Sequence, residues 1–379
     1  MARAVTIVAS GGLPVTNIDT AGALGVPLTP VSSGGVPITL VDSGGMPAVL
    51  VSETGSLFYG LAGIQPLHYW DFTANRALFN GVDVGGVAST PGWSFTRASV
   101  GSYVNLDGSL STFASGEPRR SARGLLVEET RTNLFLNSAV GVTQTVTVVI
   151  STVHTVSFRG IGTITLSGAF VGSLVGTGAS NFVALTFTPT TTSLTLTITG
   201  DVRNVNLEAN LAASSWIETA GASATRNGDV LAVSSPGITY PLTLFIEYER
   251  AVDSGTAVTL LRVDDGTLDE RAILGINGSD LARAVVADGA VTQADVTVAG
   301  ALAVNTIYKQ AGAVSTNRVQ SCVNGTLGTE DTVATMPATP SIIRCGSNEV
   351  GLTQPFVYVR RVAIFNTALN DAQLQAITS

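Results

Sequence analysis

The feature that most constrains the fold is a two-residue alternation of apolar and hydroxyl side chains over short segments. Residues 191–200 read TTSLTLTITG, so Leu194, Leu196 and Ile198 alternate with threonines. This alternation puts the apolar side chains on one face of a strand and the threonines on the other. Threonine and branched aliphatic residues favour half-buried antiparallel strands. GTITLSG, TQTVTVVIS and PLTLFIEYER repeat the pattern, so the sequence predicts an all-β protein.

The first sixty residues repeat a Gly-Gly-x-Pro phrase as GGLPVT, LGVPLT, GGVPIT and GGMPAV. Each unit alternates apolar residues as a short strand does, but proline lacks the N–H that a central ladder needs. Such short strands bury too little apolar surface to order themselves. Residues 1–60 are therefore predicted to be an extended β-repeat anchor that other chains complete. The repeat residues are Gly11, Gly12, Pro14, Pro27, Gly34, Gly35, Pro37, Gly44, Gly45 and Pro47.

Composition and turn dipeptides divide the rest of the chain into three parts. Residues 61–137 bring aromatic and charged side chains and are predicted to form an adaptor segment. Residues 138–240 are predicted to form a small antiparallel β-sandwich. Residues 241–379, punctuated by Asp-Gly and Asn-Gly turns, predict a second, jelly-roll-like sandwich. One short helix should close the chain, with Asn370 as its N-cap and Gln373 at the third helical position.

Charge and hydropathy exclude several classes of partner. The chain has 19 basic and 27 acidic residues, a net charge of −8 and a single lysine, Lys309. Without a basic stripe, no nucleic-acid partner and no anionic lipid surface are expected. Mean hydropathy is +0.38, but no apolar run reaches the ~18 residues of a spanning helix, so no membrane insertion is expected. The opening MARAVTIVASGG is too short in its apolar part for a signal peptide.

Cysteine and histidine are too few for a zinc pattern or a disulfide framework. Cys322 and Cys345 could pair if they lie on neighbouring strands in an oxidising setting. Their alternative role is that of two small buried hydrophobic side chains. His68 and His154 are expected to have structural roles, because acid–base catalysis needs a second group poised beside the ring.

Residues 117–131 form a charged segment in a sequence that otherwise has few charged residues. We expect its side chains to form an ion-pair network that fixes the first sandwich to the preceding segment or to a neighbouring subunit. A binding site for an acidic sugar is the alternative. The residues predicted to make up this motif are Arg97, Arg119, Arg123, Glu128, Glu129 and Arg131.

Three phrases resemble a recurrent module of tailed-bacteriophage virion proteins. They are WSFTRASVGSYVNLDG, EPRRSARGLLVEETRTNLFLNS and NLEANLAASSWIETAGASATRNGDVL, in this order between Trp93 and Leu231. In that module, an Arg-Ala-Ser strand and a Gly-Leu-Leu-Val-Glu-Glu segment precede a β-sandwich that ends in a Thr-Arg turn. The resemblance implies a fibre, collar or decoration protein of the virion surface, made in the host cytoplasm and often multimeric. It leaves open whether the attachment point is the head, the neck or the tail.

The last part of the chain resembles the concanavalin A-like, laminin G-type fold of lectins and glucanases. QSCVNGTLG, IIRCG and FVYVRRVAIFNTALNDAQLQAI stand in the order of that fold's last strands and closing helix. The fold serves many functions. Its glucanases carry a Glu-x-Asp-x-x-Glu triplet for retaining chemistry, and no such triplet occurs here. The nearest carboxylate cluster, VDDGTLDER, is expected to be a solvated hairpin loop, with a calcium site as the alternative.

These observations lead to three hypotheses. The first is a non-enzymatic virion structural protein with no catalytic residue, cofactor or metal, anchored by residues 1–60. Its partners would be copies of itself, with a homotrimer as the usual arrangement and a dimer or single copies as alternatives, and capsid, neck or tail proteins. The second is a receptor-binding adhesin that recognises host surface glycan through residues 241–379. The third is a polysaccharide depolymerase, which the missing carboxylate pair disfavours.

Overall fold

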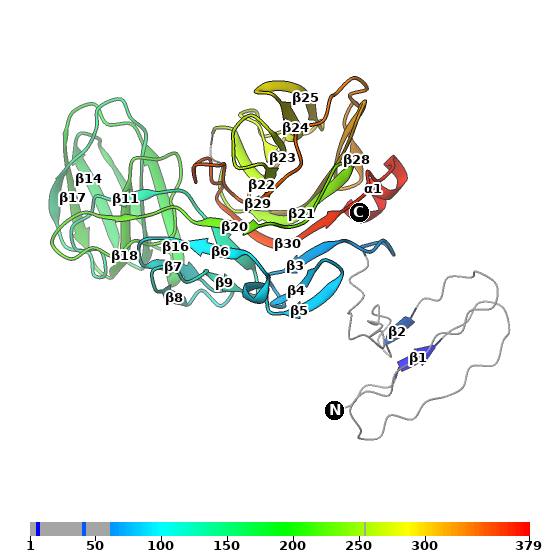
Figure 1. Cartoon of the computed structure of the whole chain (residues 1–379). Helices are drawn as coiled ribbons and strands as arrows, with labels where there is room; N and C mark the ends of the chain where they lie inside the picture. Colours follow the sequence, from blue (N-terminus) through cyan, green and yellow to red (C-terminus); the bar gives the residue numbers. More distant parts are fainter. Residues whose placement is uncertain (1–4, 8–39, 43–60, 254) are drawn as a thin grey trace, which may run out of the picture.

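Strands dominate the part of the chain that the structure describes. The computed structural model describes residues 5–7, 40–42, 61–253 and 255–379. Figure 1 shows antiparallel sheets joined by turns, with one short helix at the end of the chain, so the all-β prediction is confirmed. The glycines and prolines predicted as anchor residues lie outside the described residues. Of the N-terminal segment, β1 (Val5–Ile7) pairs antiparallel with β2 (Leu40–Asp42).

The larger of two sandwiches has a ten-stranded sheet on one side. Its strands are β3 (His68–Asp71), β4 (Arg76–Phe79), β5 (Val82–Gly85), β9 (Arg120–Ser121), β10 (Gly124–Val127), β21 (Leu242–Arg250), β26 (Thr306–Ser315), β27 (Arg318–Val323), β28 (Thr326–Leu327) and β30 (Val357–Phe365). The main order is β28-β27-β26-β21-β30-β3-β4-β5, and β10 joins β30 with β9 beside it. Both β10 and β3 can pair with the same edge of β30, because residues 357–359 of β30 pair with β10 and residues 361–364 of β30 pair with β3.

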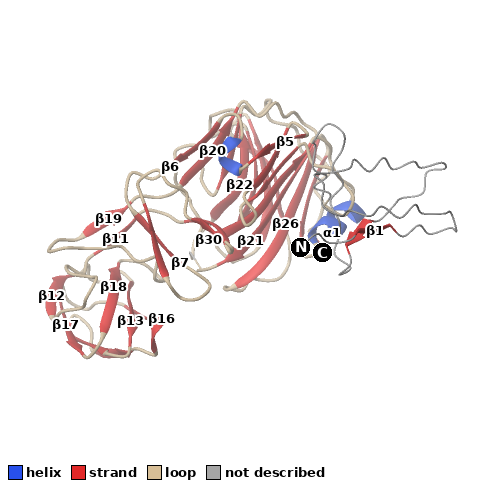
Figure 2. Cartoon of the chain, turned by 90° about the horizontal axis from the view of Figure 1, so that it is seen from below, coloured by secondary structure: helices blue, strands red, loops and turns tan. Residues whose placement is uncertain are grey.

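A seven-stranded sheet packs against the ten-stranded one and encloses the main core (Figure 2). Its strands are β6 (Trp93–Thr96), β20 (Val230–Ser234), β22 (Val258–Asp264), β23 (Arg271–Ile276), β24 (Ala282–Asp288), β25 (Val291–Thr297) and β29 (Ile342–Cys345). Their order is β25-β24-β23-β22-β29-β20-β6. Trp70, Leu244 and Ile246 from the first sheet meet Leu261 and Val263 from the second in this core.

The smaller sandwich consists of a four-stranded and a three-stranded sheet. Its strands are β12 (Gln144–Thr147), β13 (His154–Gly160), β14 (Thr163–Gly168), β15 (Gly172–Val175), β16 (Gly178–Phe187), β17 (Ser193–Thr199) and β18 (Val202–Glu208). The orders are β12-β17-β14-β15 and β16-β13-β18. Leu194 and Leu196 of β17 are fully buried against Phe158 and Leu207, whereas Thr197 and Thr199 are exposed. The alternation in residues 191–200 therefore forms the half-buried strand that it predicts.

Strand pairing crosses the domain boundaries expected from the sequence. Residues 61–137 do not stand apart as an adaptor, because β3, β4, β5, β9 and β10 lie in the ten-stranded sheet and β6 lies in the seven-stranded one. Within residues 138–240, β20 pairs with β6 and β29 of the larger sandwich. Periodicity identifies strands but carries no information about which distant strand completes a sheet. The smaller sandwich is an insertion, entered and left through the paired strands β11 (Arg131–Asn133) and β19 (Ala224–Arg226).

The hairpin turns expected from the dipeptides are present. Asp265-Gly266 and Asn277-Gly278 each lie between consecutive paired strands, and Asp288-Gly289 runs from the last residue of β24 into the turn to β25. In the turn between β27 and β28, Asn324 and Gly325 have φ of 45° and 78°, the positive values that a type I′ turn requires. The remaining elements are the hairpin of β7 (Gly101–Val104) and β8 (Leu110–Phe113) and the 3-10 helix η1 (Val87–Ser89).

Helix α1 (Asp371–Thr378) covers the outer face of the ten-stranded sheet. Asn370 caps it in a reciprocal capping box with Gln373, as the sequence predicts. Its Leu374 packs with Phe245 of the sheet and with Leu61. The start of the continuously described chain and its C-terminus therefore share one face, whereas the smaller sandwich extends from the opposite end of the molecule (Figures 1 and 2). No helix in the described part of the chain is long and apolar enough to cross a membrane.

Candidate functional site

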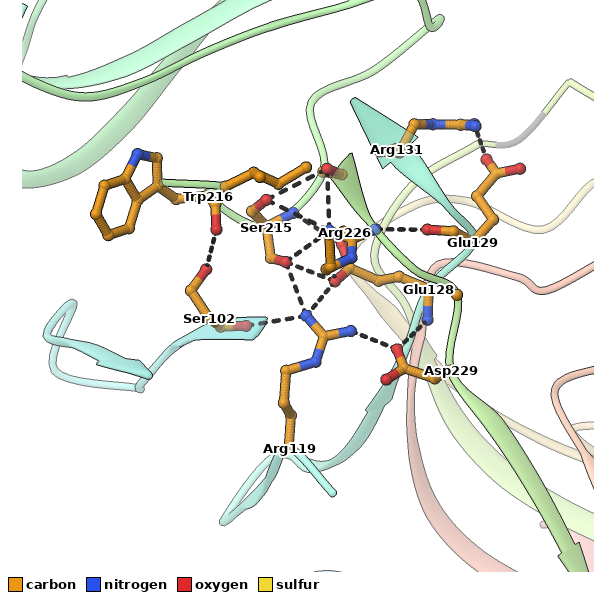
Figure 3. Close-up of polar contacts among 12 residues, drawn as sticks. Ser102, Arg119, Glu128, Glu129, Arg131, Ser215, Trp216, Arg226 and Asp229 are labelled. Atoms are coloured by element: carbon orange, nitrogen blue, oxygen red, sulfur yellow. Dashed lines mark hydrogen bonds and ion pairs between the residues drawn. The ribbon is translucent and has the colours of Figure 1, made fainter. Parts of the chain in front are cut away.

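Polar side chains from distant parts of the chain meet where the two sandwiches join (Figure 3). Each lies at or next to the end of a strand or in the loop that leaves β18, so the packed strands on either side bury it. All are at most 6% exposed, and a substrate in solution therefore has no access to them. We call this set the joint: Arg97, Arg119, Glu128, Ser215, Arg226 and Asp229.

Arg119 is the centre of the joint. Its Nη1 donates to Ser215 Oγ at 2.8 Å and to the backbone oxygen of Ser102 at 3.0 Å. The same guanidinium pairs with the carboxylates of both Glu128 and Asp229. A planar guanidinium with five N–H donors can bridge two acids in this way, whereas an ammonium is a single point of charge.

Arg97 holds the second carboxylate from the other side. Its Nη1 lies 3.1 Å from Asp229 Oδ1. Its remaining N–H groups donate to backbone oxygens, from Nε to Ser99 at 2.9 Å and from Nη2 to Ala114 at 2.7 Å. The joint therefore also ties down the loops that flank the β7–β8 hairpin.

Arg226 contributes a third guanidinium and faces the first carboxylate. Its Nη1 lies 3.2 Å from Glu128 Oε2 and donates to Ser215 Oγ at 2.8 Å. Its Nη2 donates to the backbone oxygen of Glu129 at 2.6 Å. A buried charge is tolerated when it is both paired and hydrogen-bonded in this way.

The carboxylate of Glu128 is held in its charged form. It accepts hydrogen bonds from the Ser215 backbone N–H at 2.8 Å and from Ser215 Oγ at 2.6 Å. Burial alone would raise its pKa, but the charges of Arg226 and Arg119 and the bonds from Ser215 outweigh burial and lower the pKa to about 2. Glu128 is therefore ionised at any physiological pH and cannot exchange protons with a substrate.

The joint connects one sandwich to the other. Glu128 and Asp229 adjoin β10 and β20 of the larger sandwich. Ser215 lies in a loop of the smaller sandwich, where the indole N–H of Trp216 donates to Ser138 Oγ at 3.2 Å. Ser102 of β7 reaches the same loop by donating to the Trp216 backbone oxygen at 2.7 Å. These buried hydrogen bonds and ion pairs hold the two sandwiches in a fixed relative position.

The structure brings together three of the six residues predicted as an ion-pair motif, namely Arg97, Arg119 and Glu128. The other three lie around the joint. Arg131 pairs with Glu129, both partly exposed. Arg123 pairs with Glu249 of β21, and its guanidinium carbon lies 3.7 Å from the centroid of the Tyr358 ring, a cation–π contact.

Sequence reasoning missed half of the joint. Ser215, Arg226 and Asp229 belong to the third phrase of the phage-module resemblance, so a signal was present. Nothing in the sequence signals that these residues pair with the predicted ones, since Asp229 lies 110 residues from Arg119. No rule of sequence spacing indicates that an arginine and an aspartate this far apart form an ion pair.

Of the two roles left open for the cysteines, the disulfide is not formed. Cys322 and Cys345 are free and buried. They lie on β27 and β29, which belong to different sheets, and they pack in different hydrophobic clusters. Burial raises the pKa of the Cys345 thiol to about 12. The alternative role, that of two small buried hydrophobic side chains, is the one that the structure has.

Two carboxylates of VDDGTLDER, those of Asp264 and Glu270, have structural partners. The expectation of a solvated loop is wrong for Asp264, which is 1% exposed and accepts from Nε of Arg262 at 2.7 Å and of Arg344 at 3.0 Å. Glu270 accepts from the backbone N–H groups of Gly289 and Ala338, both at 2.7 Å. Over the described residues, no group of three or more histidine, cysteine, aspartate or glutamate side chains could hold a metal ion.

Comparison with known proteins yields likenesses of fold only. No family model and no curated protein matches the sequence. Among solved structures, the CBM40 of the Ruminococcus gnavus IT-sialidase is similar, with a TM-score of 0.34, 17% identity, and coverage of 38% of this chain and 88% of that one. A SAP-like pentraxin from Limulus polyphemus has a TM-score of 0.31, 10% identity, and coverage of 37% and 70%. Trypanosoma rangeli sialidase has a TM-score of 0.31, 14% identity, and coverage of 40% and 26%.

Proposed function

We propose that the chain is a non-enzymatic structural protein of a tailed-bacteriophage particle, which displays two rigidly joined β-sandwiches on the virion surface. The observation that carries this proposal is the joint. Each of the three phrases that resemble the phage module supplies at least one of its side chains: Arg97 from the first, Arg119 from the second and Asp229 from the third. Residues that define a catalytic module would be open to a substrate, whereas these are buried and paired. The resemblance therefore concerns a structural connection.

The arrangement of the two ends supports a display role. Leu61 and α1 share one face of the larger sandwich, and the smaller sandwich extends from the opposite end (Figure 1). An anchor formed by residues 1–60 would meet the folded part at that first end. The smaller sandwich would then point away from the particle. The proposed partners are further copies of the chain, with a trimer favoured, together with capsid, neck or tail proteins.

The test is incorporation into particles made from the genome that encodes this chain. Mass spectrometry and immunogold labelling of purified particles should find the full-length protein on their surface. A deletion of residues 1–60 should leave a soluble, folded protein in the lysate and none on the particles. Normal incorporation of the deleted protein, or absence of the full-length protein from purified particles, would contradict the proposal.

Two further measurements separate this function from the alternatives. Incubation of the full chain with host-surface polysaccharide should release no reducing ends, whereas release would identify a depolymerase. Binding of the full chain to a defined host glycan on an array would add adhesin activity to the displayed sandwiches. A protein that binds glycan but never enters particles would be an adhesin of another kind.

A further inference from the structure

Strand β16 forms an unprotected edge of the smaller sandwich. It pairs with β13 on one side, and the described residues place no strand on its other side. It is ten residues long and contains no charged residue and no proline. Such an edge presents a row of unpaired backbone N–H and C=O groups to any other extended chain.

The other edge strands of the two sandwiches are short, charged or covered. Among the described residues, β5, β6, β12 and β15 have four residues each and β28 has two. Seven-residue β25 carries Asp295, which pairs with Arg283 at 3.0 Å. Seven-residue β18 is covered, because the Leu207 backbone oxygen accepts from Leu134 N–H and the Val205 N–H donates to the Ser138 oxygen, both at 2.8 Å. Natural proteins use these same devices against unwanted pairing. The backbone edge of residues 182–187 in β16 has none of them, although the Thr186 side chain contacts a loop, where its Oγ donates to the Leu211 backbone oxygen at 3.2 Å.

The open part of β16 is its C-terminal half. Near its start the register shifts, so that Gly160 pairs with Gly178 while Arg159 pairs with Phe182. The β7–β8 turn approaches there, and Arg159 Nη1 donates to the Gly108 backbone oxygen at 3.3 Å. Residues 182–187 keep regular pairing with residues 154–159. Six regular residues are enough for one more strand to add by backbone pairing.

The surface around this edge does not repel a second copy of itself. Residues 132–200 contain one charged residue, Arg159, and its Nε donates to Asn204 Oδ1 at 2.5 Å. Val183 and Leu185 are only partly buried at the rim of the core, so an added strand would cover them. An antiparallel pair of identical strands also obeys a two-fold axis, which is the symmetry of most homodimers.

We propose that residues 182–186 of β16 pair antiparallel with the same residues of a second copy of the chain, with Ala184 opposite Ala184, which joins the two small sandwiches into one continuous sheet. The contact lies at the end of the molecule away from Leu61 and α1, so it is separate from any assembly through residues 1–60. This inference does not require the virion role.

The test uses the full chain and two matched charge variants. Ala184 is exposed on the open edge, and Thr197 is exposed on β17, an interior strand of the other sheet. Sedimentation velocity over a concentration series gives the dissociation constant of each association step for the wild type, Ala184→Lys and Thr197→Lys. Two lysines brought face to face should weaken the β16 step by about tenfold. Thr197→Lys should leave that step unchanged.

Amide hydrogen exchange on the wild type gives a second readout that does not depend on how a variant folds. Amides of residues 182–186 that point away from β13 should exchange more slowly as protein concentration rises. Equal association of the wild type and Ala184→Lys would overturn the proposal, as would equal weakening by both variants. Exchange at residues 182–186 that stays fast at every concentration would overturn it as well. A folded Ala184→Lys chain that still enters particles would show that this contact and the proposed function are independent.

Discussion

Arg119 is the residue on which the joint depends most, because its guanidinium contacts both buried carboxylates. Replacing it by methionine keeps much of the volume but leaves Glu128 and Asp229 with less compensating charge. Breaking a buried pair from one side typically costs about 3 to 5 kcal/mol. We therefore expect Arg119→Met to lower the free energy of unfolding by about that amount, measured by urea denaturation at pH 7.

Arg123→Met is the matched control. Arg123 and Glu249 form an ion pair whose side chains are 19% and 16% exposed, and the arginine also contacts the Tyr358 ring. Pairs near the surface are generally worth less than about 1 kcal/mol. If Arg123→Met lowers the free energy of unfolding as much as Arg119→Met does, burial does not set the strength of these ion pairs.

His68 makes stability depend on pH. It is fully buried, its Nδ1 accepts from the Asn80 N–H at 3.3 Å, and its ring lies against Phe79. Burial lowers its pKa from 6.5 to about 4, so the folded protein keeps the ring neutral while the unfolded chain takes up a proton. Stability should therefore fall by about 3 kcal/mol as pH falls from 6.5 to 4, with no further change from this group below pH 4. His68→Asn keeps a hydrogen-bond acceptor but has no titrating ring. The unfolding free energy of this variant should therefore change less between pH 6.5 and pH 4 than that of the wild type. Identical pH profiles for the two proteins would exclude His68 as the cause.

At the scale of secondary-structure elements, the success of sequence reasoning depends on how many faces of an element are covered. Strand β17 has one buried face, so its alternation identifies it. In β21 all residues but one are buried, since Leu244 faces the main core and Phe245 lies under α1. A strand covered on both faces loses the polar half of its pattern. The sequence PLTLFIEYER thus indicates a strand but says nothing of the helix that covers it.

Helix α1 tests whether residues close together in the sequence are enough to stabilise an element. The Asn370 side chain accepts from the Gln373 N–H at 3.0 Å, and the Gln373 side chain accepts from the Asn370 N–H at 3.0 Å. Asn370→Ala removes the side-chain cap and leaves only the bond from the residue 370 N–H to the Gln373 side chain, and we expect a loss of about 1 kcal/mol in unfolding free energy. The exposed Asn366, which precedes the helix, provides the control, and Asn366→Ala should have no effect. Equal stability of the two variants would show that packing of Leu374 alone holds the helix.

At the scale of the whole molecule, the order of strands in space differs from their order along the chain. The larger sandwich takes strands from both sides of the smaller one, since β3 and β10 pair with β30, and β6 pairs with β20. Local composition marks a change near residue 138 and another near residue 241, but neither change is a boundary of a folding unit. Only the pairing of segments more than a hundred residues apart defines the unit, and a single sequence carries no direct record of such pairing.

This topology predicts which fragments can fold. Residues 241–379 lack seven strands of the larger sandwich: β3, β4, β5, β6, β9, β10 and β20. Without them β30 loses both of its partners on one side, and core residues such as Val359 and Val362 lose the strands that cover them. We expect this fragment to be insoluble or to unfold without cooperativity, as measured by circular dichroism and thermal denaturation.

Residues 61–379 with residues 134–223 replaced by Asn-Gly should instead unfold cooperatively. Asn133 and Ala224 are paired in register, so a two-residue type I′ turn can close β11 and β19 into a hairpin. The shortened chain loses the Ser215 bonds to Glu128, and leaving buried acceptors unsatisfied should cost about 1 to 3 kcal/mol relative to residues 61–379. A well-folded fragment 241–379 beside a shortened chain that fails to fold would mean that the strands before β11 belong with the smaller sandwich. The joint would then be internal to one domain, and its burial would no longer argue for a link between two.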